Sequence, residues 1–165
     1  MEKGFVHIIC GEGYGKTTVA VGQGIRSASE GKSVIIIQFL KEKQRDEIGF
    51  IKRLEPEIKV FRFEKSEKSF EELSEEEQIE ERQNLINGVN FARKVLVTEE
   101  CDVLILDEVL GLIEYGIVSA DEIRALIQAK NDETDLILTG ISQSRELWDL
   151  ADAVTEMVSR KKEEG

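Results

Sequence analysis

The sequence predicts an α/β fold in which helices cover both faces of a mostly parallel β-sheet. Apolar runs that read as strands alternate with helical patterns along the whole chain, which is the order found in parallel α/β sheets. The run at 33–39, S-V-I-I-I-Q-F, is almost continuously apolar, as strands buried on both faces are. The third observation is that an apolar run at 5–9 leads directly into a glycine-rich loop and then a helix.

Composition limits the class of protein. With 165 residues, 41% of them hydrophobic, the chain is expected to form a single domain over 1–165. Its apolar runs are shorter than the roughly 18 residues of a membrane span, and residues 1–4 lead straight into a strand, so neither a membrane segment nor a signal peptide is expected. The formal net charge of -12 argues against general affinity for nucleic acids or anionic membranes. Cys10, Cys101 and His7 are too scattered for a Cys/His metal site, and a reduced, cytoplasmic setting is expected.

The strongest motif is C-G-E-G-Y-G-K-T-T at residues 10–18. Alternate glycines let successive backbone N–H groups turn toward an anion, and the following helix adds unpaired N–H groups and a positive dipole end. Lys16 would place an ammonium among phosphate oxygens, and the Thr17 hydroxyl would ligate Mg²⁺. The motif is shorter than the usual G-x-x-x-x-G-K-[ST], and a simple glycine-rich turn is the alternative. The expected nucleotide-binding residues here are Gly11, Glu12, Gly13, Tyr14, Gly15, Lys16, Thr17 and Thr18.

The other elements have local start and stop signals. Gly31 would end the first helix, while Ser74 with Glu77 and Ser119 with Glu122 match the capping box that opens a helix. The expected strands are 5–9, 33–39, 58–63, 101–108, 135–140 and 153–155. The expected helices are 15–30, a short one within 42–54, one from 74 to about 97, a short one ending at 115, one opening at 119, and 144–150 with Ser144 as its cap.

Apolar spacing predicts which side of each longer helix packs against the sheet. Gly22 and Gly24, inside the first helix, are costly there and suggest close packing or the approach of a ligand. The charged stretch 64–81 is expected to be mostly a solvated face or loop. The expected packing residues are Val19, Ala20, Ile25 and Ala28 in the first helix and Ile79, Ile86, Val89 and Leu96 in the long one.

The strand at 101–108 ends in Asp107 and Glu108 after four apolar residues. Such an aspartate can join the shell of a magnesium ion, and the next glutamate can ligate the metal or activate a water. Two surface acids at a strand end are the alternative. Together with the loop, the pair indicates the RecA-like branch of the P-loop NTPase fold, with Lys16 and Glu108 as catalytic residues and Thr17, Asp107 and Glu108 as metal ligands.

Gln38 and Phe39 lie at the C-terminal end of the second expected strand. In open α/β sheets that edge is where ligands bind, so both residues are expected to add to the nucleotide site. A strand end that merely turns polar at the surface is the alternative.

Taken together, these motifs resemble the ATP:corrinoid adenosyltransferases of the cob(I)yrinic acid a,c-diamide adenosyltransferase type, over nearly the whole chain. The matching segments are the loop at 11–18, Q-F-L-K at 38–41, L-D-E at 106–108 followed by Tyr115-Gly116, I-L-T-G at 137–140 and A-D-A-V-T-E-M at 151–157. The resemblance implies transfer of the 5′-deoxyadenosyl group of ATP to a reduced corrinoid cobalt, with release of triphosphate. It implies ATP and Mg²⁺ as bound groups and a corrinoid as substrate. The protein partners to consider are a reductase and a second copy of the chain in a homodimer.

The resemblance also implies roles for single residues. The loop would hold the triphosphate, Lys16 would neutralise part of its charge, and Thr17 and Glu108 would match the magnesium positions with Asp107 nearby. An apolar cover over the cobalt would exclude water, and its candidates are Phe39, Phe61 and Phe63.

By this resemblance the chain is a diverged and short-tailed member. Tyr14 stands where the family has lysine, and Ile141 stands where it has arginine. Two other interpretations stay open. One is a small P-loop ATPase with Glu108 as the water-activating base. The other is a non-catalytic relative that binds ATP or a corrinoid as a carrier or regulator.

Overall fold

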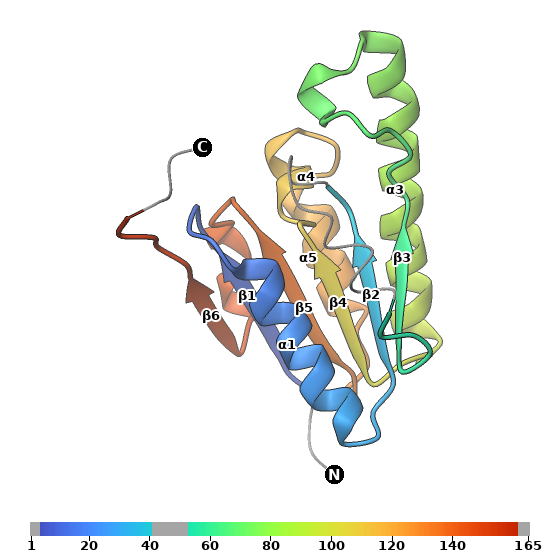
Figure 1. Ribbon diagram of the computed structural model, residues 1–165, viewed down its shortest axis with the longest axis vertical. Helices are drawn as coiled ribbons and strands as arrows, with labels where there is room; N and C mark the ends of the chain where they lie inside the picture. The colour runs from blue at the N-terminus through green and yellow to red at the C-terminus, as the bar shows by residue number, and fades with distance from the viewer. Residues whose placement is uncertain (1–3, 41–52, 162–165) are drawn as a thin grey trace.

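The computed structural model describes residues 4–40 and 53–161, and these form one parallel sheet flanked by helices (Figure 1). The six described strands have the order β3-β2-β4-β5-β1-β6, and each neighbouring pair is parallel. The predicted α/β class is therefore confirmed. The strands are β1 (Val6–Cys10), β2 (Val34–Gln38), β3 (Ile58–Arg62), β4 (Val103–Asp107), β5 (Asp135–Gly140) and β6 (Ala153–Glu156).

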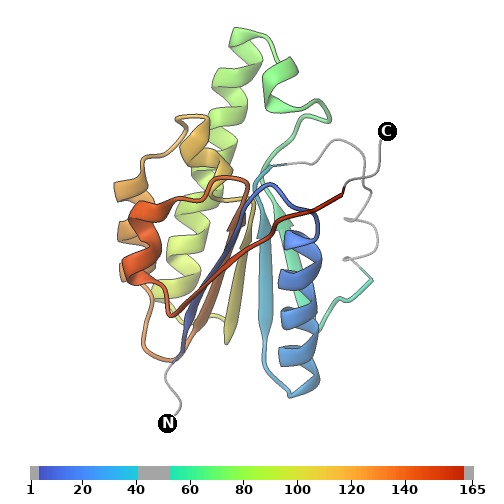
Figure 2. The same ribbon diagram turned by 90° about the vertical axis from the view of Figure 1, so that its left-hand side faces the viewer.

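Helices cover both faces of this sheet, as predicted. Figure 2 shows α1 (Lys16–Ser29) on one side and α3 (Glu75–Val97) and α5 (Ala120–Gln128) on the other. The short elements are η1 (Phe70–Glu72), α4 (Gly111–Glu114) and η2 (Arg145–Leu150). The short helix expected within 42–54 falls mainly on 41–52, outside the described residues. Of the helices in the described ranges, none has the length and apolar character needed to cross a membrane.

The alternation of side chains along the strands divides the core into two clusters. Ile105 and Ile36 face α1, whereas Leu104 and Leu106 face α3 and α5. Because successive side chains of a strand point to opposite faces, a strand covered on both sides must be apolar at every position. This explains why β2 and β4 read as continuous apolar runs.

The packed side of the two longer helices is predicted correctly in part: Ala20, Ala28, Ile86, Val89 and Leu96 pack against the core, whereas three other predicted residues do not. In α1, Val19 and Ile25 are 37% and 41% exposed, and the buried side is formed by smaller residues that include Ala20 and Gly24. These small residues let α1 approach the strands closely. In α3, Ile79 is 68% exposed because the first turns of the helix extend beyond the sheet (Figure 1).

The helix starts were predicted with mixed success. Ser74 accepts a hydrogen bond from the Glu77 N–H while Glu77 accepts one from the Ser74 N–H, so this capping box is confirmed. Ser119 likewise accepts from the Glu122 N–H at 3.1 Å. Ser144 does not cap its helix, because it adopts a left-handed conformation with φ of 48° and its hydroxyl donates to Ser142. The segment that follows is a 3₁₀ helix rather than an α-helix.

Two glycines in α1 provide a matched test of this packing. A Cβ at Gly22 would meet nothing within 4 Å, whereas one at Gly24 would lie 3.0 Å from Ile105 Cδ1. We expect Gly22→Ala to raise the free energy of unfolding by about 0.5–1 kcal/mol, because alanine loses less backbone entropy in a helix. Gly24→Ala gains the same propensity but crowds the core, so we expect a net loss of about 1 kcal/mol. Urea denaturation measures both; equal effects would contradict close packing at Gly24.

Candidate functional site

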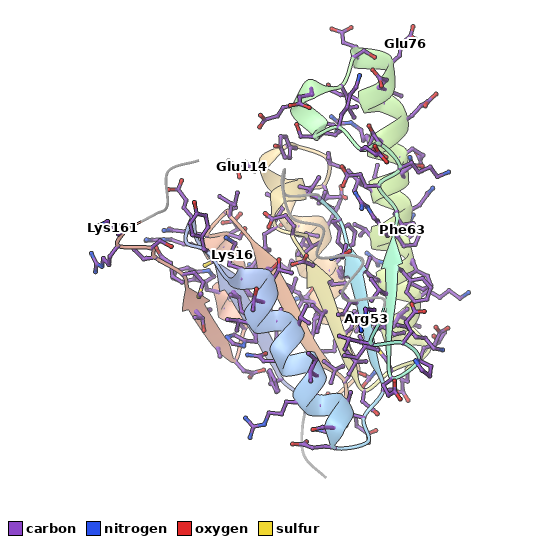
Figure 3. The ribbon with its side chains drawn as sticks, in the orientation of Figure 1. Lys16, Arg53, Phe63, Glu76, Glu114 and Lys161 are labelled. Atoms are coloured by element: carbon purple, nitrogen blue, oxygen red, sulfur yellow. The ribbon has the colours of Figure 1, made fainter. Side chains whose placement is uncertain are left out.

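The sheet order brings the ends of several strands together at one edge. Because all the described strands are parallel, β1, β2, β4 and β5 end at the same side of the sheet. The strand β5 lies between β1, which leads into the glycine-rich loop, and β4, which ends in Asp107. Ligands of open α/β sheets bind at this carboxyl edge. Figure 3 shows Lys16 and Glu114 toward this end of the molecule.

The glycine-rich loop has the backbone of an anion cradle. Gly11 and Gly15 have φ of 106° and 99°, values that favour glycine. Helix α1 begins directly after Gly15 with no side-chain cap and no acid in its first turn. Its first N–H groups can therefore face an anion. The Lys16 side chain is buried and folds back over the loop, where its Nζ donates to the Gly13 carbonyl at 2.9 Å.

The exposed residues of the loop are Glu12, Tyr14 and Thr18, whereas Thr17 is half-buried. The predicted residues of the loop thus alternate between exposed and buried positions. Tyr14, which stands where the resembled family has lysine, is 49% exposed.

The segment after β6 packs against this loop. The Gly13 N–H donates to the Met157 carbonyl at 2.8 Å, and the Met157 N–H donates to the Cys10 carbonyl at 2.8 Å. The Tyr14 N–H donates to Ser159 Oγ at 3.0 Å. A Cβ at Gly13 would lie 2.5 Å from the Met157 backbone, so only glycine fits there. A cavity of about 400 Å³ lies between the loop and residues 156–159.

A network of hydroxyl groups holds the acid at the end of β4. The Thr17 hydroxyl donates to Asp107 Oδ1 at 2.8 Å, and the Thr139 hydroxyl donates to the same oxygen at 2.9 Å. Thr139 Oγ1 in turn accepts from the Glu108 N–H at 2.9 Å. Thr139 is fully buried, and sequence analysis did not assign it to the site. The one feature of the sequence that could have pointed to Thr139 is its place as a polar residue near the end of a mostly apolar strand.

The two acids at the end of β4, Asp107 and Glu108, have different hydrogen-bond partners. Asp107 contacts the Thr17 hydroxyl, whereas Glu108 Oε1 accepts from the Ile141 N–H at 3.1 Å. Glu108 has a φ of 60°, which is uncommon outside glycine and turns the chain sharply at this point. The structure thus brings Thr17 and Asp107 together directly. The role of Glu108 as a metal ligand or a base stays a prediction.

The oxygen atoms near Asp107 fit a magnesium ion. Mg²⁺ prefers hydroxyl, carboxylate, phosphate and water oxygens, and it usually takes only one or two carboxylates from a protein. The Thr17 hydroxyl and the Asp107 carboxylate supply this set. Gln38 pairs in register with Asp107, and its buried Oε1 has no hydrogen-bond partner among the described residues. Those residues contain no group of three His, Cys, Asp or Glu that could hold a metal by themselves, so phosphate and water would complete the shell.

A second cavity, of about 280 Å³, opens beside the end of β4. Its apolar part is formed by Leu40, Phe70, Tyr115 and Ile141, and its charged part by Glu64, Glu71, Glu108 and Glu114. The rings of Phe70 and Tyr115 lie 5.3 Å apart.

The Tyr115 hydroxyl donates to Glu71 Oε1 at 2.8 Å. Burial, this hydrogen bond and the charges of Glu71, Glu114 and Glu108 raise the pKa of Tyr115 to about 12.

The three phenylalanines predicted to cover a cobalt do not line this cavity, and that role stays a prediction. Phe39 is fully buried in the core beneath α3, and its direct contact with any ligand stays a prediction. Phe61 and Phe63 are partly buried, and both rings pack against Phe91 of α3, with centroids at 4.8 and 5.5 Å. The aromatic residues that line the cavity are Phe70 and Tyr115. Nothing in the sequence pointed to Phe70, because it lies in a charged stretch that reads as solvated, and sequence analysis did not place Tyr115 in a cavity.

Comparison with known proteins gives a consistent result over the whole chain. A profile of the family described as ATP:corrinoid adenosyltransferase BtuR/CobO/CobP matches residues 2–164. Corrinoid adenosyltransferase CobA of Salmonella typhimurium is 27% identical over 156 residues, which are 94% of this chain and 77% of that protein. A corrinoid adenosyltransferase of Escherichia coli strain K12 is 26% identical over 156 residues, with the same coverage.

Among solved structures, flagellar accessory protein FlaH from Methanocaldococcus jannaschii matches with a TM-score of 0.61. The two chains are 17% identical, and the match covers 94% of this chain and 72% of that one. This likeness concerns the fold alone. With the observed strand order, it agrees with the predicted α/β fold of a parallel sheet between helices; the assignment of the chain to the RecA-like branch stays a prediction.

Removing the Thr139 hydroxyl tests the network around Asp107. Thr139→Val keeps the shape of the side chain but leaves the Glu108 N–H without its acceptor and Asp107 Oδ1 with one donor fewer. We expect the free energy of unfolding to fall by about 1–3 kcal/mol, and the affinity for Mg-ATP to fall as well. Urea denaturation and calorimetric titration measure the two effects. Thr139→Ser keeps the hydroxyl and should behave much more like the wild type. If Thr139→Val and Thr139→Ser change stability and affinity equally, the hydroxyl network does not determine either quantity.

Lys16→Ala tests the loop. Lys16 is a buried cation at the start of α1, so we expect this variant to lose almost all affinity for Mg-ATP while it stays folded. Calorimetric titration gives the affinity, and circular dichroism checks the fold. Arg26→Ala removes an exposed cation from the last turn of the same helix and is the matched control. A folded Lys16→Ala protein with wild-type affinity would remove the loop from the site.

Proposed function

We propose that the site at the carboxyl edge of the sheet carries the reaction of the ATP:corrinoid adenosyltransferase family, to which this chain belongs. As a member of that family, the chain is an ATP-dependent transferase that adenosylates a corrinoid. The observation that carries the proposal is the hydrogen bond of 2.8 Å between Thr17 and Asp107. It joins the phosphate-loop helix to the acid strand. A nucleotide and its metal ion would therefore meet at one point of the sheet edge.

In this proposal the triphosphate of ATP lies along residues 11–18. The N–H groups at the start of α1 would donate to its oxygens, and Lys16 would exchange its bond to the Gly13 carbonyl for a bond to phosphate. Because Lys16 is buried, its charge acts in a medium of lower effective dielectric than water and attracts phosphate more strongly.

Thr17 and Asp107 are the proposed ligands of Mg²⁺, in the first shell or through water. The bound ion would neutralise negative charge on the leaving triphosphate. The Thr139 hydroxyl would keep the Asp107 carboxylate in one orientation, since it donates to the same oxygen as Thr17. Glu108 would lie between this metal site and the second cavity, whose wall it shares.

In the proposed reaction, an electron pair of cobalt(I) forms the bond to C5′ of ATP. The bond from C5′ to oxygen breaks, and its electron pair leaves with the triphosphate. Cobalt becomes formally cobalt(III), and no side-chain nucleophile is needed. The protein therefore contributes position and charge stabilisation, which are large effects when the reacting atoms are held in line.

We propose that the corrinoid presents one face to the cavity of about 280 Å³. The cavity is slightly smaller than the roughly 300–1,000 Å³ typical of sites that enclose a ligand, so it would hold part of the macrocycle rather than surround it. The Phe70–Tyr115 pair offers an apolar surface there.

A reducing setting suits this chemistry. Cobalt must first be reduced, and we propose that a separate reductase in the cytoplasm supplies the electron.

Cys10 and Cys101 are free and buried, and burial raises the pKa of both thiols, that of Cys101 to about 12. Neutral thiols of this kind are poor nucleophiles and poor metal ligands.

The products of ATP test the proposal, because each candidate function breaks a different bond. With Mg-ATP and chemically reduced cobalamin, we expect phosphorus NMR to show triphosphate in equal amount to the adenosylated corrinoid. Without corrinoid we expect little ADP. The Lys16→Ala variant should form none of these products.

Two results would contradict the proposal. Rapid formation of ADP and phosphate without corrinoid would favour a small ATPase that uses Glu108 as its base. Bound ATP with no turnover of any kind would favour a carrier or regulator.

A further inference from the structure

One buried polar atom beside the proposed metal site has no partner. Gln38, the last residue of β2, is 8% exposed, and its side-chain oxygen Oε1 accepts no hydrogen bond from the described residues. A buried acceptor without a donor costs free energy, and such atoms are rare in folded proteins. The unpaired oxygen of Gln38 is explained if a bound group supplies the missing donor.

Gln38 lies beside Asp107 on the face of the sheet that α1 covers. The two residues pair in register across β2 and β4. Two positions earlier on these strands, Ile36 and Ile105 pack in the cluster that faces α1, and side chains two apart on a strand share a face. Because neighbouring strands lie only about 4.8 Å apart, Gln38 and Asp107 can act on the same bound group.

The polar neighbours of Gln38 donate elsewhere. The hydroxyls of Thr17 and Thr139 have one hydrogen each, and both donate it to Asp107 Oδ1. Arg62 pairs with Gln38 from β3, but its guanidinium lies 3.8 Å from the carboxylate of the glutamate two residues further on. Within the part of the chain that the structure describes, none of these donors reaches Gln38 Oε1.

The chemistry of Mg-ATP limits what the missing donor can be. Triphosphate bound to a metal ion is deprotonated near neutral pH, so its oxygens accept hydrogen bonds but do not donate them. Mg²⁺ keeps several of its water molecules when it binds to a protein. Those waters are strong donors, because the cation polarises their O–H bonds. Acceptors that hold such waters orient the ion from its second shell.

We propose that Gln38 is a positioning residue for the magnesium site, and that its Oε1 accepts a hydrogen bond from a water bound to the ion. Gln38 acts on the metal through this water and does not touch the reacting atoms. Its role rests on the proposed function, in which Thr17 and Asp107 hold Mg²⁺.

The metal dependence of ATP binding tests this role without any turnover. Gln38→Met removes the acceptor and keeps an unbranched side chain. We expect it to lower by roughly tenfold the ratio of the dissociation constant for ATP in EDTA to that in excess Mg²⁺. Calorimetric titration measures both constants. The affinity for metal-free ATP should stay unchanged; a loss there would assign the oxygen to a ribose hydroxyl or the adenine amine and overturn the role.

The same variant should stabilise the protein without ligand. An apolar side chain in place of an unpaired buried amide removes the desolvation cost of that group, so we expect the melting temperature of Gln38→Met to rise by about 2–4 °C. A residue that served only the packing of the fold would lose stability instead. A lower melting temperature would therefore contradict an acceptor reserved for a bound group.

Gln23→Met is the matched control. Gln23 also has a buried Oε1 without a partner among the described residues, but its amide nitrogen lies 3.4 Å from His7 Nδ1, further along α1 than the metal site. We expect this variant to leave the metal dependence of ATP binding unchanged. An equal loss in Gln23→Met and Gln38→Met would overturn the proposed role of Gln38.

A count of water ligands separates a positioning role from direct ligation. Electron–nuclear double resonance of bound Mn²⁺-ATP in ¹⁷O-labelled water gives this count. We expect at least one water on the ion in the wild type and the same number in Gln38→Met. One additional water in the variant would show that Gln38 ligates the metal itself, and no water in the wild type would leave Oε1 without its donor; either result overturns the proposal.

The outcomes also distinguish this role from the proposed function. If the metal dependence and the water count behave as expected but phosphorus NMR shows no triphosphate with reduced cobalamin, the role of Gln38 stands and the proposed transfer fails. An unchanged metal dependence in folded Gln38→Met, with triphosphate still formed by the wild type, overturns the role of Gln38 alone.

Discussion

One carboxylate oxygen joins three elements of this site. Asp107 Oδ1 accepts from Thr17 at the start of α1 and from Thr139 at the end of β5. β5 separates β4 from β1 and pairs with both, so the sheet's own hydrogen bonds set the distance between the acid strand and the loop strand. The two hydroxyls add contacts from side chains of α1 and β5 to the acid. A buried carboxylate that accepts two hydrogen bonds is strongly oriented. The orientation of the Asp107 carboxylate therefore depends on two threonines.

The two cavities meet at a single side chain. Ile141 follows β5 and lines both the cavity beside the loop and the acidic cavity beside Glu108. Its backbone N–H also holds the Glu108 carboxylate. Ile141 therefore places an apolar side chain, 43% exposed, between the two cavities.

Local patterns allowed the strands, the loop and the Asp–Glu pair to be predicted, since each depends on a few consecutive residues. The motifs placed Thr17, Asp107 and Glu108 near one metal ion, and the direct hydrogen bond between Thr17 and Asp107 is seen only in the structure. What could not be predicted depends on tertiary approach. Apolar spacing identified Ala20 and Ala28 correctly as packed residues of α1, but Val19 and Ile25 are exposed and Gly24 lies on the buried side instead. The Phe70–Tyr115 pair joins segments 45 residues apart in a stretch dominated by charge.

The contact between the loop and Met157 limits how far the motif can be treated as a portable unit. Gly11 and Gly13 have no room for a Cβ because the Met157 backbone lies against them, at 2.7 and 2.5 Å from where each Cβ would be. Part of the glycine pattern is thus set by a chain segment about 145 residues away rather than by phosphate. Grafting residues 10–18 onto another strand and helix would transfer the ammonium and the hydroxyls. It would leave the loop without the backbone that supports its shape.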